Sequence, residues 1–177
     1  AWSRVAPIDS AGNDIIASVT GDGVIQYSGT VNAARDIIAT TAAGNVNYEK
    51  QVEAGRSVMA LTDKGDVTYN ASVVAEDSLL ADVLEGDVTV NNDIVARQGY
   101  VTLTLADGSA TVGKADGTGK IKAGNDVSIT TSKGDATVKT SITSDNGSVS
   151  VSSEKGNINV GEVPTANAIL AQKDVNL

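Results

Sequence analysis

Residues 44–64 read GNVNYEKQVEAGRSVMALTDK, and residues 65–85, which follow directly, read GDVTYNASVVAEDSLLADVLE. Each stretch begins with Gly and Asn or Asp, and continues with Val-x-Tyr, Val-x-Ala and a third apolar pair. Tyr48 and Tyr69 are therefore 21 residues apart, as are Val52 and Val73. A fixed spacing of this kind is typical of stacked repeat proteins, in which each repeat packs on its neighbours.

The repeat continues in both directions from these two copies. Gly23 and Gly86 extend the series of glycines, and Tyr27 and Val90 extend the series that contains the tyrosines. Later copies keep the frame with small insertions, in the apolar residues Ile94, Ala96, Val101, Leu103, Ala110, Val112, Ile121, Ala123, Val127, Ile129, Ala136, Val138, Ile142, Val149, Val151, Ile158 and Val160. With a looser first copy that begins at Ile8, the chain contains about seven copies.

Each copy contains three short segments that alternate apolar and polar residues, which is the pattern of a β-strand with one buried face. One copy alone buries too little apolar surface to offset the entropy lost by ordering its backbone, so the copies must stack. Stacking also pairs the backbone of each segment with the next copy. We therefore predict an all-β fold, a right-handed parallel β-helix (solenoid) with about seven full coils of about 21 residues and three short strands each.

The composition agrees with a thin aliphatic core. The chain has no Phe, one Trp and four Tyr, together with 18 Gly for the many corners. Cys and His are absent, which excludes disulfides, thiolate metal sites and a histidine base. The formal net charge of −9 argues against nucleic acid as a partner, because phosphate binding needs clustered Lys and Arg. No apolar run is long enough to insert in a membrane.

Residues 1–177 are predicted to form a single β-helix segment, with residues 1–7 as an entry segment and residues 8–177 as the stacked coils. Ile169, Ala171, Val175 and Leu177 repeat the first two segments of one more copy. A solenoid normally ends in a cap that covers its last strands. We therefore expect that this chain is an internal fragment of a longer protein.

Three phrases of the sequence carry a family resemblance. AARDIIATT at residues 33–41, AGNDVSITT at residues 123–131 and KGNINV at residues 155–160 resemble the repeats of filamentous haemagglutinin-type adhesins and related autotransporter passengers. The resemblance covers residues 8–177 and concerns the repeat pattern, which many right-handed β-helices share. It implies a protein that is secreted to the surface of a Gram-negative-type bacterium, where the β-helix forms a rigid stalk.

Two enlarged corners are candidates for a binding surface, because loops on a rigid scaffold often carry function. The links Gly113–Lys120 and Gly161–Ala168 are each five residues longer than the usual link at this corner, and they lie two coils apart. Their polar candidates are Lys114, Asp116, Lys120 and Glu162. The alternative is that solenoids tolerate insertions at corners without any function.

A second candidate surface is apolar. In the predicted register five side chains of the middle segments point outward, namely Ile16, Ile38, Met59, Leu61 and Leu80. Exposed apolar patches often mark contacts with a partner. We expect this stripe to pack on a partner or on another part of the parent protein, unless a terminal segment near Trp2 covers it.

A column of acids follows the corner glycines, formed by Asp66, Asp87 and Asp135. Stacked carboxylates could bind Ca²⁺ or act as acid and base in polysaccharide cleavage. Asn45, Ser109 and Asn157 occupy the same column, however, and this exchange of residue types favours a role as turn formers.

The residues together favour a non-enzymatic structural and binding module without a cofactor or metal. With the resemblance, this becomes a rod-like stalk segment of a large secreted or surface-anchored bacterial adhesin. Its expected partners are a protein or glycan on a host or neighbouring cell, or other parts of the parent adhesin. The alternative is a carbohydrate-active, polysaccharide-cleaving β-helix that calcium assists. No cluster of acids with Lys or Arg in one groove across adjacent coils is evident from the sequence.

Overall fold

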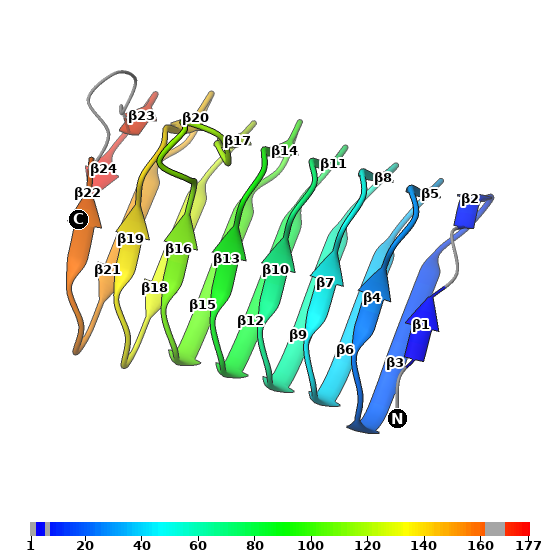
Figure 1. The fold of residues 1–177 in the computed structure, drawn as a ribbon. Helices are drawn as coiled ribbons and strands as arrows, with labels where there is room; N and C mark the ends of the chain where they lie inside the picture. Colours follow the sequence, from blue (N-terminus) through cyan, green and yellow to red (C-terminus); the bar gives the residue numbers. More distant parts are fainter. Residues whose placement is uncertain (1–2, 6–7, 162–168) are drawn as a thin grey trace.

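The structure is a computed structural model that describes residues 3–5, 8–161 and 169–177, and the side chains from residue 12 onward within these ranges. It consists of three parallel sheets of eight strands each, which run along the whole molecule (Figure 1). The chain is a right-handed parallel β-helix of about seven turns, as the repeat predicts. The part of the chain that is described has no helix long and apolar enough to cross a membrane.

The strands of each sheet are stacked in chain order. Sheet A contains β1 (Ser3–Val5), β4 (Ile25–Tyr27), β7 (Val46–Tyr48), β10 (Val67–Tyr69), β13 (Val88–Val90), β16 (Ala110–Val112), β19 (Ala136–Val138) and β22 (Ile158–Val160). Sheet B contains β2 (Ile8–Ala11), β5 (Val31–Ala33), β8 (Val52–Ala54), β11 (Val73–Ala75), β14 (Ile94–Ala96), β17 (Ile121–Ala123), β20 (Ile142–Ser144) and β23 (Ile169–Ala171). Sheet C contains β3 (Ile15–Asp22), β6 (Ile37–Ala43), β9 (Val58–Lys64), β12 (Leu79–Glu85), β15 (Val101–Asp107), β18 (Val127–Thr131), β21 (Val149–Ser153) and β24 (Val175–Asn176).

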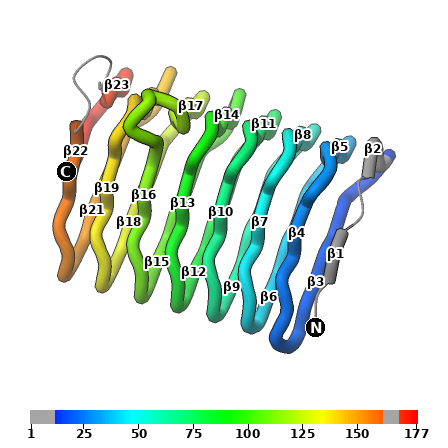
Figure 2. Tube along the Cα trace, in the orientation of Figure 1, coloured from blue at the N-terminus to red at the C-terminus, as the bar shows by residue number. Residues whose placement is uncertain are grey.

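One coil is defined here as a strand of sheet B followed by one of sheet C and one of sheet A. Coil 1 is thus β2–β4, coil 2 is β5–β7, and the series continues to coil 7, which is β20–β22. The tube in Figure 2 shows the coils following one another at an even pitch. The corners between sheets are called the A–B, B–C and C–A corners below.

The register between coils is the one that the 21-residue spacing predicts. Tyr69 pairs with Tyr48, Val73 with Val52, and Ala81 with Ala60. The pairing stays in step through the insertions of the later coils, because the extra residues lie in the corners and leave the strands aligned. Residues of one column therefore lie directly above one another, which confirms the predicted fold.

The core is a narrow channel of inward-pointing side chains from all three sheets. Tyr27, Tyr48 and Tyr69 form its bulkiest part and are fully buried. Their rings stack with centroids 4.9 and 5.0 Å apart and interplanar angles of 9° and 6°. This spacing follows from the strand separation of about 4.8 Å, which places equal side chains of successive coils face to face.

Sheet C contributes one more inward position per coil than the sequence indicates. Thr41, Thr62 and Thr131 point into the core and are buried, beyond the two apolar positions that were expected. Threonine is tolerated there because its hydroxyl is bonded: Thr41 Oγ1 donates to the carbonyl oxygen of Gly44 at 2.7 Å, and Thr131 Oγ1 to that of Gly134 at 2.6 Å. Val83 and Leu105 occupy the same column in coils 4 and 5, so the column mixes polar and apolar residues and is less evident in the sequence than the two columns before it.

Glycine is required at the C–A corner for two reasons. Gly65 has a φ of 143°, which is a conformation that residues with a side chain rarely adopt. A Cβ at this position would also overlap the carbonyl oxygen of Gly44 in the preceding coil. The glycine column thus reflects close contact between the backbones of successive coils.

Candidate functional site

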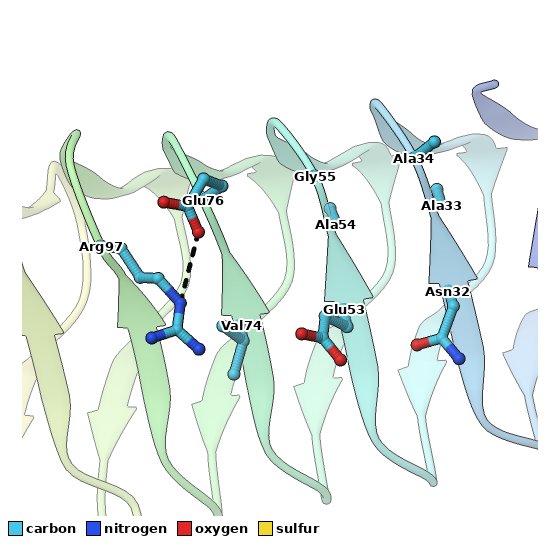
Figure 3. A pocket seen from close by; sticks show the side chains of 9 residues that line it. All are labelled: Asn32, Ala33, Ala34, Glu53, Ala54, Gly55, Val74, Glu76 and Arg97. Carbon is cyan, nitrogen blue, oxygen red and sulfur yellow. Dashed lines mark ion pairs between the residues drawn. The ribbon is translucent and has the colours of Figure 1, made fainter. Parts of the chain in front are cut away.

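A groove lies on the outer face of sheet B, next to the B–C corner of coils 2–5 (Figure 3). It has a volume of about 400 Å³, which is within the usual size of ligand pockets. The groove is lined by Asn32, Ala33, Ala34, Glu53, Ala54, Gly55, Val74, Glu76 and Arg97. We call it the sheet B groove.

The size of the side chains at the corner explains the groove. Ala34, Gly55, Glu76 and Arg97 occupy equivalent positions in coils 2, 3, 4 and 5, each directly after its sheet B strand. The first two are small and leave a hollow, whereas the last two are long and close one end. A Cβ on Gly55 would overlap the carbonyl oxygen of Ala34, so close packing of the coils keeps this position small.

The charges of the groove are unequally compensated. Glu76 accepts a hydrogen bond from Gln98 Nε2 at 2.9 Å and forms an ion pair with Arg97, whose Nε lies 3.4 Å from Glu76 Oε2. Glu53 points outward from β8, is exposed, and forms neither an ion pair nor a side-chain hydrogen bond among the described residues. The groove therefore holds one carboxylate that is free to accept a cation or a hydrogen-bond donor.

Sequence reasoning did not identify this groove. It did not connect the two acids and the arginine, because Glu53 lies within a strand whereas the other two lie at the corner. One signal in the sequence could have revealed the hollow. Along one column with 21-residue spacing, the side chains change from small to long: Ala34, Gly55, Glu76 and Arg97.

The predicted apolar stripe lies on the outer face of sheet C, around the same corner. Ile16 pairs with Ile38, Ile38 with Met59, and Met59 with Leu80, so these four residues form one column over coils 1–4. Ile16 is 67% exposed, and the other three are half-buried because each packs against its neighbours in the column. Leu61 is also half-buried and lies in the adjacent column, two residues further along β9. The prediction that a segment near Trp2 covers the stripe concerns a residue outside the described part of the chain.

Two apolar residues that the sequence did not single out enlarge this surface. Tyr100 is 52% exposed and lines a small hollow of about 60 Å³ with Met59, Leu80 and residues of the B–C corner. Leu84 is 54% exposed and lines a second hollow with Leu61. The first hollow includes Asp77, which directly follows Glu76 of the sheet B groove, so both surfaces meet at one corner.

The column of the apolar stripe ends at coil 5, where Leu80 is paired with Thr102. Thr102 pairs with Ser128, and Ser128 with Ser150, so the same face of coils 5–7 is polar. The apolar stripe of coils 1–4 and the sheet B groove of coils 2–5 therefore share coils 2–4 of the rod.

The candidate loop Gly113–Lys120 projects from the A–B corner between β16 and β17 (Figures 1 and 2). Lys114, Asp116 and Lys120 are exposed. Asp116 Oδ1 accepts hydrogen bonds from the hydroxyl of Thr118 at 2.6 Å and from its backbone N–H at 2.9 Å, and these bonds lower the pKa of Asp116. This carboxylate therefore stabilises the loop itself. Glu162, the remaining candidate, and residues 162–168 lie outside the described residues.

The acid column at the C–A corner forms a chain of hydrogen bonds between coils. Asp66 Oδ1 accepts from the backbone N–H of Asp87 at 2.9 Å, and Asp87 Oδ1 accepts from that of Ser109 at 2.8 Å. Asp135 Oδ1 in turn accepts from the N–H of Asn157 at 2.7 Å. This geometry matches the interpretation of these residues as turn formers. Within the described residues, no three Asp or Glu side chains form a group that could hold a metal ion.

Comparisons of the chain with protein-family models, with curated proteins and with solved structures found no match.

Proposed function

We propose that the protein is a non-enzymatic, rod-like binding module of a secreted or surface-anchored bacterial adhesin. The observation that carries this proposal is the continuous in-register stack, in which an evenly spaced scaffold presents the sheet B groove and the apolar stripe on one flank. The secreted location and the adhesin class rest on the resemblance of the repeats.

The scaffold is suited to a stalk because backbone groups at the corners are also paired between coils. At the C–A corner, the N–H of Gly65 donates to the carbonyl oxygen of Glu85 at 2.8 Å, and that of Val67 to Asp87 at 2.9 Å. Side-chain hydrogen bonds of the acid column add a second connection at the same corner. Bending the rod would break these bonds on one side, so the stack resists bending.

The binding function is tested by adhesion of beads. Beads coated with the purified protein should attach to epithelial cells or to bacterial cells more often than beads coated with albumin, and soluble protein should compete for the attachment. Equal attachment of both kinds of bead to every cell type would refute the proposal. Small-angle X-ray scattering extrapolated to zero concentration provides the matching test of shape, because a rigid rod gives the scattering curve of an elongated particle and a compact globule does not.

The sheet B groove also supports a second candidate, a polysaccharide-cleaving β-helix. Two carboxylates and one guanidinium from adjacent coils line this groove, which is the constellation that such an enzyme requires: Glu53, Glu76 and Arg97. Incubation with neutral and anionic polysaccharides, with and without Ca²⁺, would then release new reducing ends. Turnover that Glu53→Gln abolishes and the distant Glu154→Gln retains would favour this candidate over the binding module.

A further inference from the structure

We propose that the B–C corner of coils 2–5 is a docking surface for a partner protein segment that combines one Lys or Arg with a nearby apolar residue. The cationic side chain occupies the sheet B groove, and the apolar residue packs on the apolar stripe beside Tyr100. This inference rests on the proposed binding function and names the chemistry of the partner.

The charge of the groove selects the cation. Glu53 has no partner among the described residues, whereas the nearby arginines are already paired. Arg35 Nε lies 3.4 Å from Asp14 Oδ1, and Arg56 Nη2 lies 3.6 Å from Asp36 Oδ2. Arg97 is paired with Glu76 in the groove itself. The carboxylate of Glu53 is therefore the uncompensated charge, and the net charge of −9 of the chain attracts a cationic partner from a distance.

The lining of the groove fits the stem of such a side chain. Ala34 and Val74 place methyl groups along the groove, and Asn32 and Glu53 provide polar groups at its margin. Lys and Arg combine an aliphatic stem with a charged end, so they can cover an apolar lining while the charge reaches a carboxylate. An acidic ligand would instead meet Glu53 without a compensating cation.

The geometry of the corner sets the spacing of the two residues in the partner. Gly55 lines the groove, and Met59, four residues later, lines the hollow beside Tyr100. Four residues span at most about 14 Å when extended, and the chain turns a corner between these positions. A partner segment with Lys followed by Leu three or four residues later can therefore reach both surfaces.

The test uses a peptide in which Lys and Leu are four residues apart in a Gly-Ser background, titrated into the ¹⁵N-labelled protein at low salt. We expect amide shifts of Glu53, Gly55, Val74 and Tyr100, and no shifts on the same faces of coils 6 and 7. Acetylation of the Lys should weaken binding about tenfold, because it removes the charge-assisted contact. Replacement of the Leu by Ser should weaken binding by a similar factor.

Matched variants separate a specific contact from general attraction to an acidic protein. Glu53→Gln and Glu154→Gln remove the same charge from exposed positions in coils 3 and 7. Weakening by Glu53→Gln alone supports the proposal, and equal weakening by both variants overturns it. Absence of amide shifts at the corner also overturns it, whereas attachment of coated beads to cells in the same case would leave the proposed function standing.

Discussion

Replacement of Tyr48 by Phe should stabilise the protein. Tyr48 is fully buried between Tyr27 and Tyr69, and its hydroxyl has no hydrogen-bond partner among the described residues. A buried hydroxyl without a partner loses its hydrogen bonds to water, which costs about 1–3 kcal/mol. Phe keeps the stacked ring and removes this cost, so we expect the free energy of unfolding to rise by about 1–2 kcal/mol.

Urea denaturation followed by circular dichroism measures this change, with a parallel thermal melt. For a chain of this size, the expected gain corresponds to a rise of about 3–6 °C in the melting temperature. Tyr100→Phe is the matched control, because its ring is 52% exposed and its stability should change by less than about 0.5 kcal/mol. A loss of stability in Tyr48→Phe would refute the reasoning, since it would show that the hydroxyl makes a favourable hydrogen bond.

Three further predictions follow from the stack. Burial raises the pKa of Tyr27 from 10.0 to about 12 and also raises the pKa values of Tyr48 and Tyr69. The stability that the three neutral tyrosines contribute is therefore fully present below pH 10 and is lost as the pH rises through their raised pKa values. Urea midpoints measured from pH 8 to pH 12 check this prediction. Gly65→Ala should lower the free energy of unfolding, measured by urea denaturation, by at least about 2 kcal/mol, because Gly65 has a positive φ and an added Cβ would overlap the preceding coil. Gly21 has open space around it, so Gly21→Ala should be nearly neutral. Asp66→Ala should cost about 1 kcal/mol, since it removes the acceptor for the N–H of Asp87, and added Ca²⁺ should not change the melting temperature of either protein.

The fold could be predicted because the residues of one column are nearly identical from coil to coil. Tyr27, Tyr48 and Tyr69 are each separated by one repeat of 21 residues in the sequence. A parallel stack is the arrangement that brings residues with this spacing together in every sheet. The insertions did not disturb this prediction, because they fall at corners, where extra residues leave the strands paired.

The candidate sites could be predicted only in part. The column from Ile16 to Leu80 follows from alternation along the strands, and its register is as expected. The sheet B groove depends instead on the relative sizes of side chains in neighbouring coils, which an alternation pattern does not show. Tyr100 reaches the apolar stripe because its coil has an extra residue at the B–C corner, and this position lies outside the regular frame.

Disulfide cross-linking tests the stacked register most directly, because the native chain has no cysteine. Asn47 and Thr68 are paired on the outer face of sheet A, and their Cα atoms should be about 4.8 Å apart, within the range that a disulfide spans. Asn47 and Thr89 are two coils apart, at about twice this distance. The double variant Asn47→Cys/Thr68→Cys should oxidise rapidly and completely, and Asn47→Cys/Thr89→Cys should remain reduced. Failure of the first pair to form, or equal oxidation of both, would contradict the stacked β-helix.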